Sequence, residues 1–210
     1  MKEKKVLVEA DASTEEKIKQ AARAIFHKKG FAATRTRDIA EEAGLNLALL
    51  NYYFRSKQKL FDLIMLETMQ QFFLSLTEVF NDRETSLEKK VEVLVSNYID
   101  LLTEEPDIPI FILSELRNNP QELVAKIRVK EILMKSYLME QLQEAVKAGI
   151  IAPIHPVQFI MNIMGLTVFP FIAKPIFSNL GNLSETDFNQ LMAQRKALVP
   201  KWVKAIMATS

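Results

Sequence analysis

The chain has no cysteine, only two histidines and only 5 glycines, which are residues that many short enzyme motifs require. Without cysteine it has neither a disulfide framework nor a thiolate metal site. Its two histidines, His27 and His155, lie far apart in the sequence, and such a pair alone does not indicate a metal. Only 5 of the 210 residues are glycine, and they form no Gly-rich phosphate loop. We find no paired nucleophile and base, so we expect a protein that is not an enzyme and has no cofactor.

Long apolar runs are also missing. The first 13 residues, MKEKKVLVEADAS, contain only a short apolar run, which is not a secretory signal. The most apolar stretch, residues 159–173, contains Asn162 and Pro170 and is shorter than the about 18 to 20 apolar residues of a membrane span. We therefore expect a cytoplasmic protein that does not bind a membrane, with residues 1–13 forming a flexible arm.

Charge is distributed unevenly along the chain. Residues 1–60 carry 13 Lys and Arg against 8 Asp and Glu, a net charge of +5, and the remainder carries 14 against 18, a net charge of −4. A basic N-terminal quarter on an acidic body is typical of a DNA-reading head, although chance produces such an asymmetry equally well. Half of the residues are apolar, so 210 residues are enough for one or two globular domains with a sizeable core.

The stretch from Thr34 to Phe61 predicts two short helices joined by a tight turn, followed by the start of a third helix. Residues 37–43 form the first helix, which Gly44 ends because glycine adopts the left-handed conformation at little cost. Asn46 is a favourable N-cap for a second helix over residues 47–54. Because so few residues separate the helices, the chain must turn sharply. This is the helix-turn-helix pattern, whose second helix enters the major groove of DNA.

An amphipathic helix precedes this pattern. We expect it to open at Ser13 or Thr14 and to stop at Gly30, with one apolar stripe facing the two short helices. The result is a three-helix head whose expected core contains Phe31, Ile39, Leu50 and Phe54.

The pattern from Ala21 to Leu60 resembles the N-terminal domain of TetR-type transcriptional regulators. The resemblance implies an all-α fold with a helix-turn-helix DNA-binding domain over residues 14–60 and a ligand-binding and dimerisation domain over residues 61–210. It also implies a homodimer that binds a near-palindromic DNA operator as a repressor and is released by a small, largely apolar ligand. The matching residues are Phe26, Gly30, Phe31, Thr34, Ile39, Ala40, Ala43, Gly44, Leu50, Tyr53, Phe54 and Lys57.

Two residues depart from the family pattern. Arg35 stands where the family usually has a capping Ser or Thr, so Thr34 or Thr36 caps the helix instead, or Arg35 turns outward to a phosphate. Asn51 stands where the family usually has a Tyr that touches the DNA backbone. An Asn either bonds to a phosphate or reads adenine through its N6 and N7 atoms.

The remaining expected DNA contacts follow from side-chain chemistry and from the resemblance. Arg37 either contacts guanine or phosphate, or is a surface residue paired with Glu41. Tyr53 and Lys57 resemble the family's phosphate clamps, and Lys57 lies at a helix N-terminus, which attracts anions. Three apolar residues at the tip of the second helix either cover thymine methyl groups or pack on the neighbouring helix. The complete set of expected DNA contacts is Thr34, Arg35, Thr36, Arg37, Asn46, Leu47, Ala48, Leu49, Asn51, Tyr52, Tyr53 and Lys57.

The rest of the chain predicts further helices, over residues 57–80, 86–105, 110–117, 121–148, 157–177 and 185–207. The segment 157–177 is apolar nearly all round, and a second copy of the chain would cover it in a two-fold dimer. The alternative is burial within one protomer. Expected interface residues are Phe159, Ile160, Ile163, Met164, Phe171, Phe188 and Trp202.

The many methionines and phenylalanines of the body suit an adaptable apolar pocket, although core packing explains each of them as well. Expected pocket residues are Phe72, Phe111, Met134, Tyr137, Met161, Met164 and Phe169. A second hypothesis for the whole protein is a helical ligand-carrying or scaffolding dimer whose head contacts protein. A salt titration with DNA separates the two hypotheses, because binding to DNA weakens steeply as salt rises.

Overall fold

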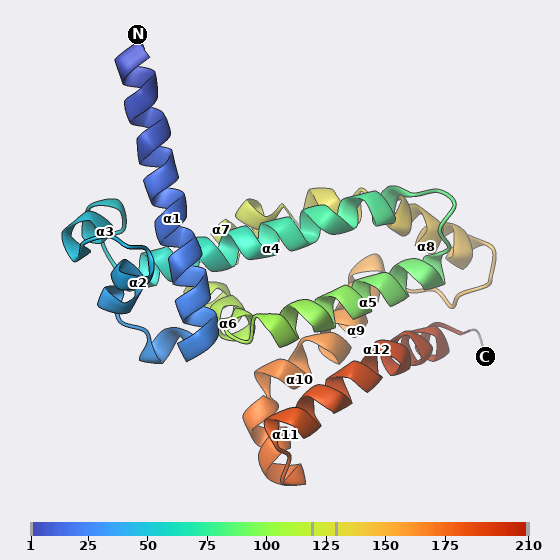
Figure 1. Cartoon of the computed structure of the whole chain (residues 1–210). Coiled ribbons are helices and arrows are strands. Elements are labelled where there is room, and N and C mark those ends of the chain that lie inside the picture. Colours follow the sequence, from blue (N-terminus) through green and yellow to red (C-terminus); the bar gives the residue numbers. More distant parts are fainter. Residues whose placement is uncertain (1, 119, 129, 209–210) are drawn as a thin grey trace. The chain divides into compact units, whose positions relative to one another are not determined.

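The computed structural model describes residues 2–118, 120–128 and 130–208, without the side chains of residues 2–12, 27 and 115. Helices make up the described part, together with one isolated antiparallel bridge between Ile151 and Ala208 (Figure 1). The all-α fold expected from the sequence is therefore confirmed. The chain is divided into two compact units, Met1–Thr68 and Met69–Ser210.

The first unit contains α1 (Lys2–Ala33), α2 (Thr36–Glu42), α3 (Leu47–Tyr53) and the first turns of α4 (Lys57–Asn81). α1 begins at Lys2, well before the start expected at Ser13 or Thr14. The flexible arm stays a prediction, because the side chains of residues 2–12 lie outside the described part. Gly30 has φ 73° and interrupts α1, so the expected stop is present as a kink inside the assigned helix.

The core of this unit joins all four helices. Ile18, Ile39, Leu50 and Ile64 are each at most 1% exposed, and they come from α1, α2, α3 and α4 in turn. The rings of Phe26 and Phe31 lie 5.2 Å and 4.6 Å from the ring of Phe61, measured between centroids. Of the four expected core residues, three are buried and Phe31 is half-buried.

The second unit has an antiparallel framework of amphipathic helices at its centre. α12 (Glu185–Met207) packs along α5 (Leu87–Glu104), and both contact α9 (Pro156–Thr167). Figure 1 shows α12 running beside α5. The remaining elements are the rest of α4, then α6 (Ile108–Asn118), α7 (Pro120–Ile127), the π-helical turn η1 (Lys130–Met134), α8 (Tyr137–Lys147), α10 (Phe169–Ile172) and α11 (Lys174–Gly181).

Two long helices expected from the sequence are broken in the structure. The stretch 121–148 is divided into α7, η1 and α8, and Arg128 at the first break has a left-handed φ of 57°. The apolar stretch 157–177 is divided into α9, α10 and α11. Pro170 and Pro175 open the two short helices, where a missing N–H costs nothing. Both expectations of one continuous helix are wrong, because apolar periodicity does not record such breaks.

A buried lysine fastens the loop between α4 and α5 to α8. Lys90 is fully buried, and its ammonium donates to the carbonyl oxygen of Asp82 at 2.6 Å and to the side-chain oxygen of Gln141 at 2.9 Å. The ring of Tyr137 covers the same ammonium, 4.6 Å from its centre. Burial lowers the pKa of Lys90, although nearby Asp82 opposes this. These contacts satisfy the buried charge within the body.

Within the described residues, no single helix has the length and hydropathy of a membrane span. The helices over Pro156–Ile172 and Lys174–Gly181 meet that composition only as a pair, with a bend of 68° between them.

Candidate nucleic-acid interface

The turn between α2 and α3 has the geometry expected from its residues. Gly44 has φ 66°, a conformation that favours glycine. The N–H groups of Gly44 and Leu45 donate to the carbonyls of Glu41 and Ala40 at 3.1 Å and 2.9 Å, which closes the end of α2. At the start of α3, the side-chain oxygen of Asn46 accepts from the N–H of Leu49 at 2.7 Å. The predicted N-cap is confirmed, so Asn46 uses its oxygen within the protein.

One side of α3 is buried and the other is open. Leu50 is 1% exposed and anchors the inner side, while Tyr52 on the outer side is 75% exposed. Ala48 and Asn51 are exposed as well, and Leu47, Leu49 and Tyr53 are half-buried. Because Leu47 and Leu49 are partly covered, the apolar tip of the helix is less open than the sequence indicated. The rings of Tyr52 and Tyr53 meet edge to face with centroids 5.4 Å apart.

The expected DNA contacts in and before the first turn of α2 differ in the exposure of their side chains. Arg35 and Arg37 are exposed, and Thr36 at the first helical position is half-buried. Thr34 is 2% exposed, and its hydroxyl donates to the carbonyl of Gly30 at 2.7 Å. Its side chain is committed to the backbone, so its expected DNA contact and its expected capping role are both wrong.

Asp38 performs the capping that Thr34 and Thr36 do not. Its carboxylate oxygen Oδ2 accepts from the backbone N–H of Arg35 at 3.0 Å and pairs with the ammonium of Lys29 at 3.0 Å. The hydrogen bond from Arg35 and the ion pair with Lys29 hold the pKa of Asp38 below its usual value. The side chain of Arg35 is thereby left exposed at the surface. No ion pair joins Arg37 to Glu41 within the described part of the head, which leaves Arg37 available to a ligand.

Lys57 has a more internal position than a surface clamp would have. Its ammonium donates to the carbonyl oxygens of Phe31 and Thr34 at 2.7 Å and 2.8 Å, and it lies 4.2 Å from the centre of the Phe31 ring. A lysine has three N–H donors, so two of them are already used within the head. The first turn of α4 is thus joined to the end of α1 and to the residue that follows it.

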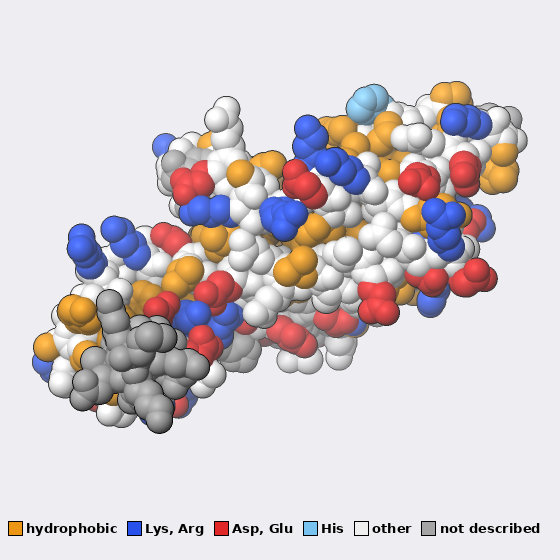
Figure 2. Space-filling view, turned by 90° about the horizontal axis from the view of Figure 1, so that it is seen from above, with side chains coloured by type: hydrophobic (Ala, Val, Ile, Leu, Met, Phe, Trp, Pro, Cys, Tyr) orange, Lys and Arg blue, Asp and Glu red, His pale blue; other side chains and the backbone are white. Residues whose placement is uncertain are grey.

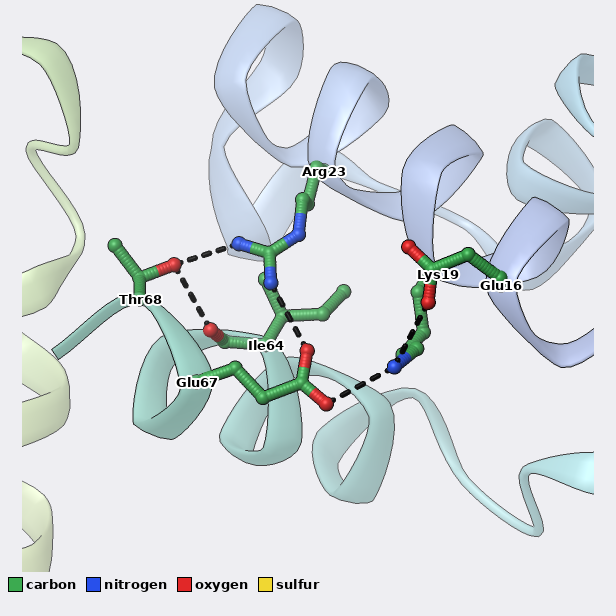
Figure 3. A network of polar contacts seen from close by, with 6 residues as sticks. All are labelled: Glu16, Lys19, Arg23, Ile64, Glu67 and Thr68. Atoms are coloured by element: carbon green, nitrogen blue, oxygen red, sulfur yellow. Dashed lines mark hydrogen bonds and ion pairs between the residues drawn. The ribbon is translucent and has the colours of Figure 1, made fainter. Parts of the chain in front are cut away.

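A polar network joins α1 to α4 on another side of the head (Figure 3). The two carboxylate oxygens of Glu67 pair with Lys19 and Arg23, each at 3.0 Å, and Arg23 also donates to the hydroxyl of Thr68 at 2.6 Å. Burial alone would lower the pKa of Lys19, but the carboxylates of Glu67 and Glu16 outweigh it and raise this pKa. The sequence analysis missed this network, because its members lie 44 to 48 residues apart.

Arg55 is a second feature that the sequence analysis missed. It lies two residues after the end of α3, its side chain is exposed, and it forms no salt bridge within the described head. Lys59, in the first turn of α4, is also exposed. The available signal in the sequence was a basic residue shortly after the second helix of the helix-turn-helix pattern.

The seven expected pocket residues do not meet around one cavity. Phe72 and Phe111 belong to the core, with 9% and 4% exposure. Met134, Met161 and Phe169 lie at the surface, and Tyr137 and Met164 are half-buried. A groove does exist between α5 and α12, but none of the seven lines it. The expected pocket residues therefore do not line this groove, and their pocket stays a prediction.

The expected interface residues also divide into two groups. Phe159, Ile163 and Phe188 are at most 1% exposed and form part of the protomer's own core, so their assignment to an interface is wrong. Ile160, Met164 and Phe171 are half-buried, and Trp202 is exposed. Other apolar residues, on α9, α10, α11 and α12, are exposed instead. Figure 2 shows apolar side chains lying among charged ones on one face of the molecule. The open residues are Val157, Met161, Phe169, Ile176, Leu180, Leu191, Leu198 and Ile206.

Comparison with known proteins agrees with this geometry. Residues 18–64 match the family model of bacterial regulatory proteins, tetR family. The chain is 24% identical over 170 residues to the Bacillus subtilis (strain 168) protein named "Probable HTH-type transcriptional regulator YttP", which covers 80% of this chain and 82% of that protein. It is 30% identical over 121 residues to the fatty acid metabolism regulator protein of the same organism. This match covers 58% of this chain and 60% of that protein.

Solved structures show the same fold. A TetR-family transcriptional regulator from Mesorhizobium loti MAFF303099 aligns with a TM-score of 0.63 at 20% identity, over 94% of this chain and 98% of that one. FadR from Bacillus subtilis, crystallised with stearoyl-CoA, aligns with a TM-score of 0.57 at 23% identity, over 88% and 96%. The family model over residues 18–64 and the relatives support a TetR-type DNA-binding transcriptional regulator, and the solved structures show that the chain shares the fold.

Proposed function

We propose that the protein is a homodimeric repressor that reads a near-palindromic operator with α3 and releases it when a small molecule binds the second unit. The observation that supports this most is the head itself. The capped α3 presents Asn51 and Tyr52 on its exposed side, and Arg35, Arg37 and Arg55 of the same head are exposed as well. Guanidinium and amide groups are the side chains that pair with base edges and phosphates.

Within this proposal the exposed residues have separate roles. Arg37 reads a guanine, because its guanidinium is exposed, forms no ion pair with the described residues and matches the O6 and N7 acceptors. Asn51 reads an adenine or bonds to a phosphate from the open side of α3. Arg35 and Arg55 bind phosphates and set the orientation of the helix without selecting a sequence. Lys57 acts mainly by positioning the start of α4.

The dimer is supported by two apolar stripes that stay exposed in the described part of the protomer. On α9, Val157, Met161 and Gly165 recur every four residues on the exposed side, opposite the buried Phe159 and Ile163, and Phe169 at the start of α10 is exposed as well. On α12, Leu191, Leu198, Trp202 and Ile206 form a similar exposed stripe. The same two stripes of a second copy would cover them in an isologous contact.

A ligand response is supported by the relatives. One is named for fatty acid metabolism, and FadR was solved with stearoyl-CoA. In the proposed mechanism the ligand binds preferentially to the dimer conformation whose heads no longer fit successive major grooves. Such a difference in affinity between two states is what couples ligand binding to DNA release.

Selection of bound duplexes from a random pool tests the proposal. We expect enrichment of one near-palindromic sequence, with half-sites about 10 base pairs apart or more. Binding should weaken steeply between about 50 and 200 mM salt. A folded, ligand-free protein that retains no duplex at low salt would contradict DNA reading and favour a head that contacts protein.

A further inference from the structure

A groove runs between the first turns of α5 and the last turns of α12. Its volume is about 720 Å³, within the range of small-molecule sites. The segment after α8 closes one end, because Ile151 forms the antiparallel bridge with Ala208 and the N–H of Ala152 donates to the carbonyl of Met207 at 2.9 Å. The proposed DNA and dimer contacts leave this groove unused.

The floor of the groove is apolar. Leu87 and Val91 of α5, Val203 and Met207 of α12, and Ile151 from the connecting segment line it, and each is at most 9% exposed. Ile150 stands at the edge and is 69% exposed. A polar ligand would gain nothing from such a floor, whereas an alkyl chain would remove apolar surface from water.

The rim carries an excess of positive charge. Four lysines line the groove against two glutamates, so its formal charge is +2. Glu92 pairs with Lys89 at 3.0 Å, and Glu88 lies 3.9 Å from Lys204. The third ion pair at the rim joins Lys196 to Asp100.

Lys201 is the exception on this rim. It is exposed and has no salt bridge within the described residues. It also lies one turn from Lys204 on the same helix, an arrangement in which like charges repel. Lysines near the C-terminus of a helix interact favourably with the helix dipole. Their positive charge is therefore stabilised even without a bound anion. A lysine pair above an apolar floor is complementary to an anion that carries a chain.

The groove stays accessible in the proposed dimer. On α12 the core residues Phe188, Met192, Val199 and Val203 form one stripe. With 3.6 residues per turn, Ala197 and Lys204 fall on one flank of it, with Lys201 beside Lys204 on the side away from the core, and Leu198 and Trp202 fall on the opposite flank. A second copy that covers the latter flank leaves the former open.

We propose that this groove binds a single-chain aliphatic carboxylate, with the chain on the apolar floor and the carboxylate at Lys201 and Lys204. This inference deepens the proposed ligand response, and its role as an effector site rests on that function. Binding itself does not depend on DNA recognition.

Calorimetric titration of the full chain with decanoate, without DNA, tests the site. We expect saturable binding at one site per protomer, and binding of 1-decanol, which has the same chain and no charge, weaker by about tenfold or more. Absence of decanoate binding to the folded protein, or equal affinity for the alcohol, would overturn the proposal.

Variants distinguish the rim from the floor. Lys201→Glu should weaken decanoate about tenfold or more and leave 1-decanol unchanged. Ile150→Gln should weaken both ligands, and it should fold normally because Ile150 is mostly exposed. Lys135→Glu is the matched control, since Lys135 is exposed and does not line the groove. If Lys201→Glu binds decanoate as the parent chain does, the assignment of the carboxylate is wrong.

A second readout separates the site from the function. Decanoate should release the selected operator duplex from the parent protein and should release it less readily from Lys201→Glu. If decanoate binds but does not release the operator duplex, the binding site is supported and its role as an effector site is wrong. Failure to bind any duplex would contradict the proposed function alone, because the titration contains no DNA.

Discussion

The ammonium of Lys57 lies 2.7 Å from the carbonyl oxygen of Phe31 and 4.2 Å from the centre of the same residue's ring. The backbone where α1 ends is thereby joined to the first turn of α4. A residue expected from its position to hold DNA is in fact part of what holds the head together. This changes what its replacement should do.

Replacing Lys57 by Met should lower the free energy of unfolding by about 1 to 3 kcal/mol, because two partly buried carbonyls lose their donor. Urea denaturation followed by circular dichroism measures the change. Lys59→Met is the matched control, since Lys59 is exposed two residues further along, and its effect should stay within about 0.5 kcal/mol. If the Lys57→Met protein is as stable as the parent but its DNA binding depends less on salt, Lys57 binds a DNA phosphate and does not stabilise the head.

Replacing Glu67 by Gln should destabilise the protein by about 1 to 2 kcal/mol, because Lys19 and Arg23 lose their shared carboxylate. These side chains are 14% to 29% exposed, so solvent screens the pairs only in part. Glu92→Gln removes a more exposed pair with Lys89 and should have almost no effect. Equal unfolding midpoints for the two variants would show that the Glu67 network is not stabilising.

Replacing Arg37 by Ala should relax the preference at one base pair of each half-site by about 1 to 3 kcal/mol. Competition between duplexes with single substitutions measures it. Arg55→Ala is the informative partner, because loss of a phosphate contact should weaken all sequences alike and reduce the salt slope by about 1. An unchanged sequence preference in the Arg37→Ala protein would show that Arg37 does not contact a base.

Replacing Met161 by Glu should convert the dimer to monomers, because it places a charge in the middle of the exposed stripe of α9. Light scattering during size-exclusion chromatography measures the mass. Leu74→Glu is the matched control, since Leu74 and Met161 are both 59% exposed. The assignment of this surface fails if both variants elute with the mass of the parent protein.

The local rules of the sequence were sufficient for the head. Gly44 and Asn46 act through the neighbouring backbone, and so does Ser56, whose hydroxyl accepts from the N–H of Lys59 at 3.1 Å at the start of α4. The turn and these two helix starts could therefore be predicted from residue type alone. The apolar periodicity likewise located α3, α5 and α12 to within a residue or two. No such rule covers a contact between residues that are distant in the chain.

Tertiary packing decided the rest. Phe159 and Met161 are both apolar residues of one helix, yet one is buried and the other is 59% exposed, because α5 and α12 cover only one side of α9. The pocket residues were chosen by composition, whereas the groove depends on where α5 and α12 separate. The sequence by itself therefore determined an all-α chain with a helix-turn-helix head. Which side chains remain open to DNA, to a second copy or to a ligand was settled only by the way the helices cover one another.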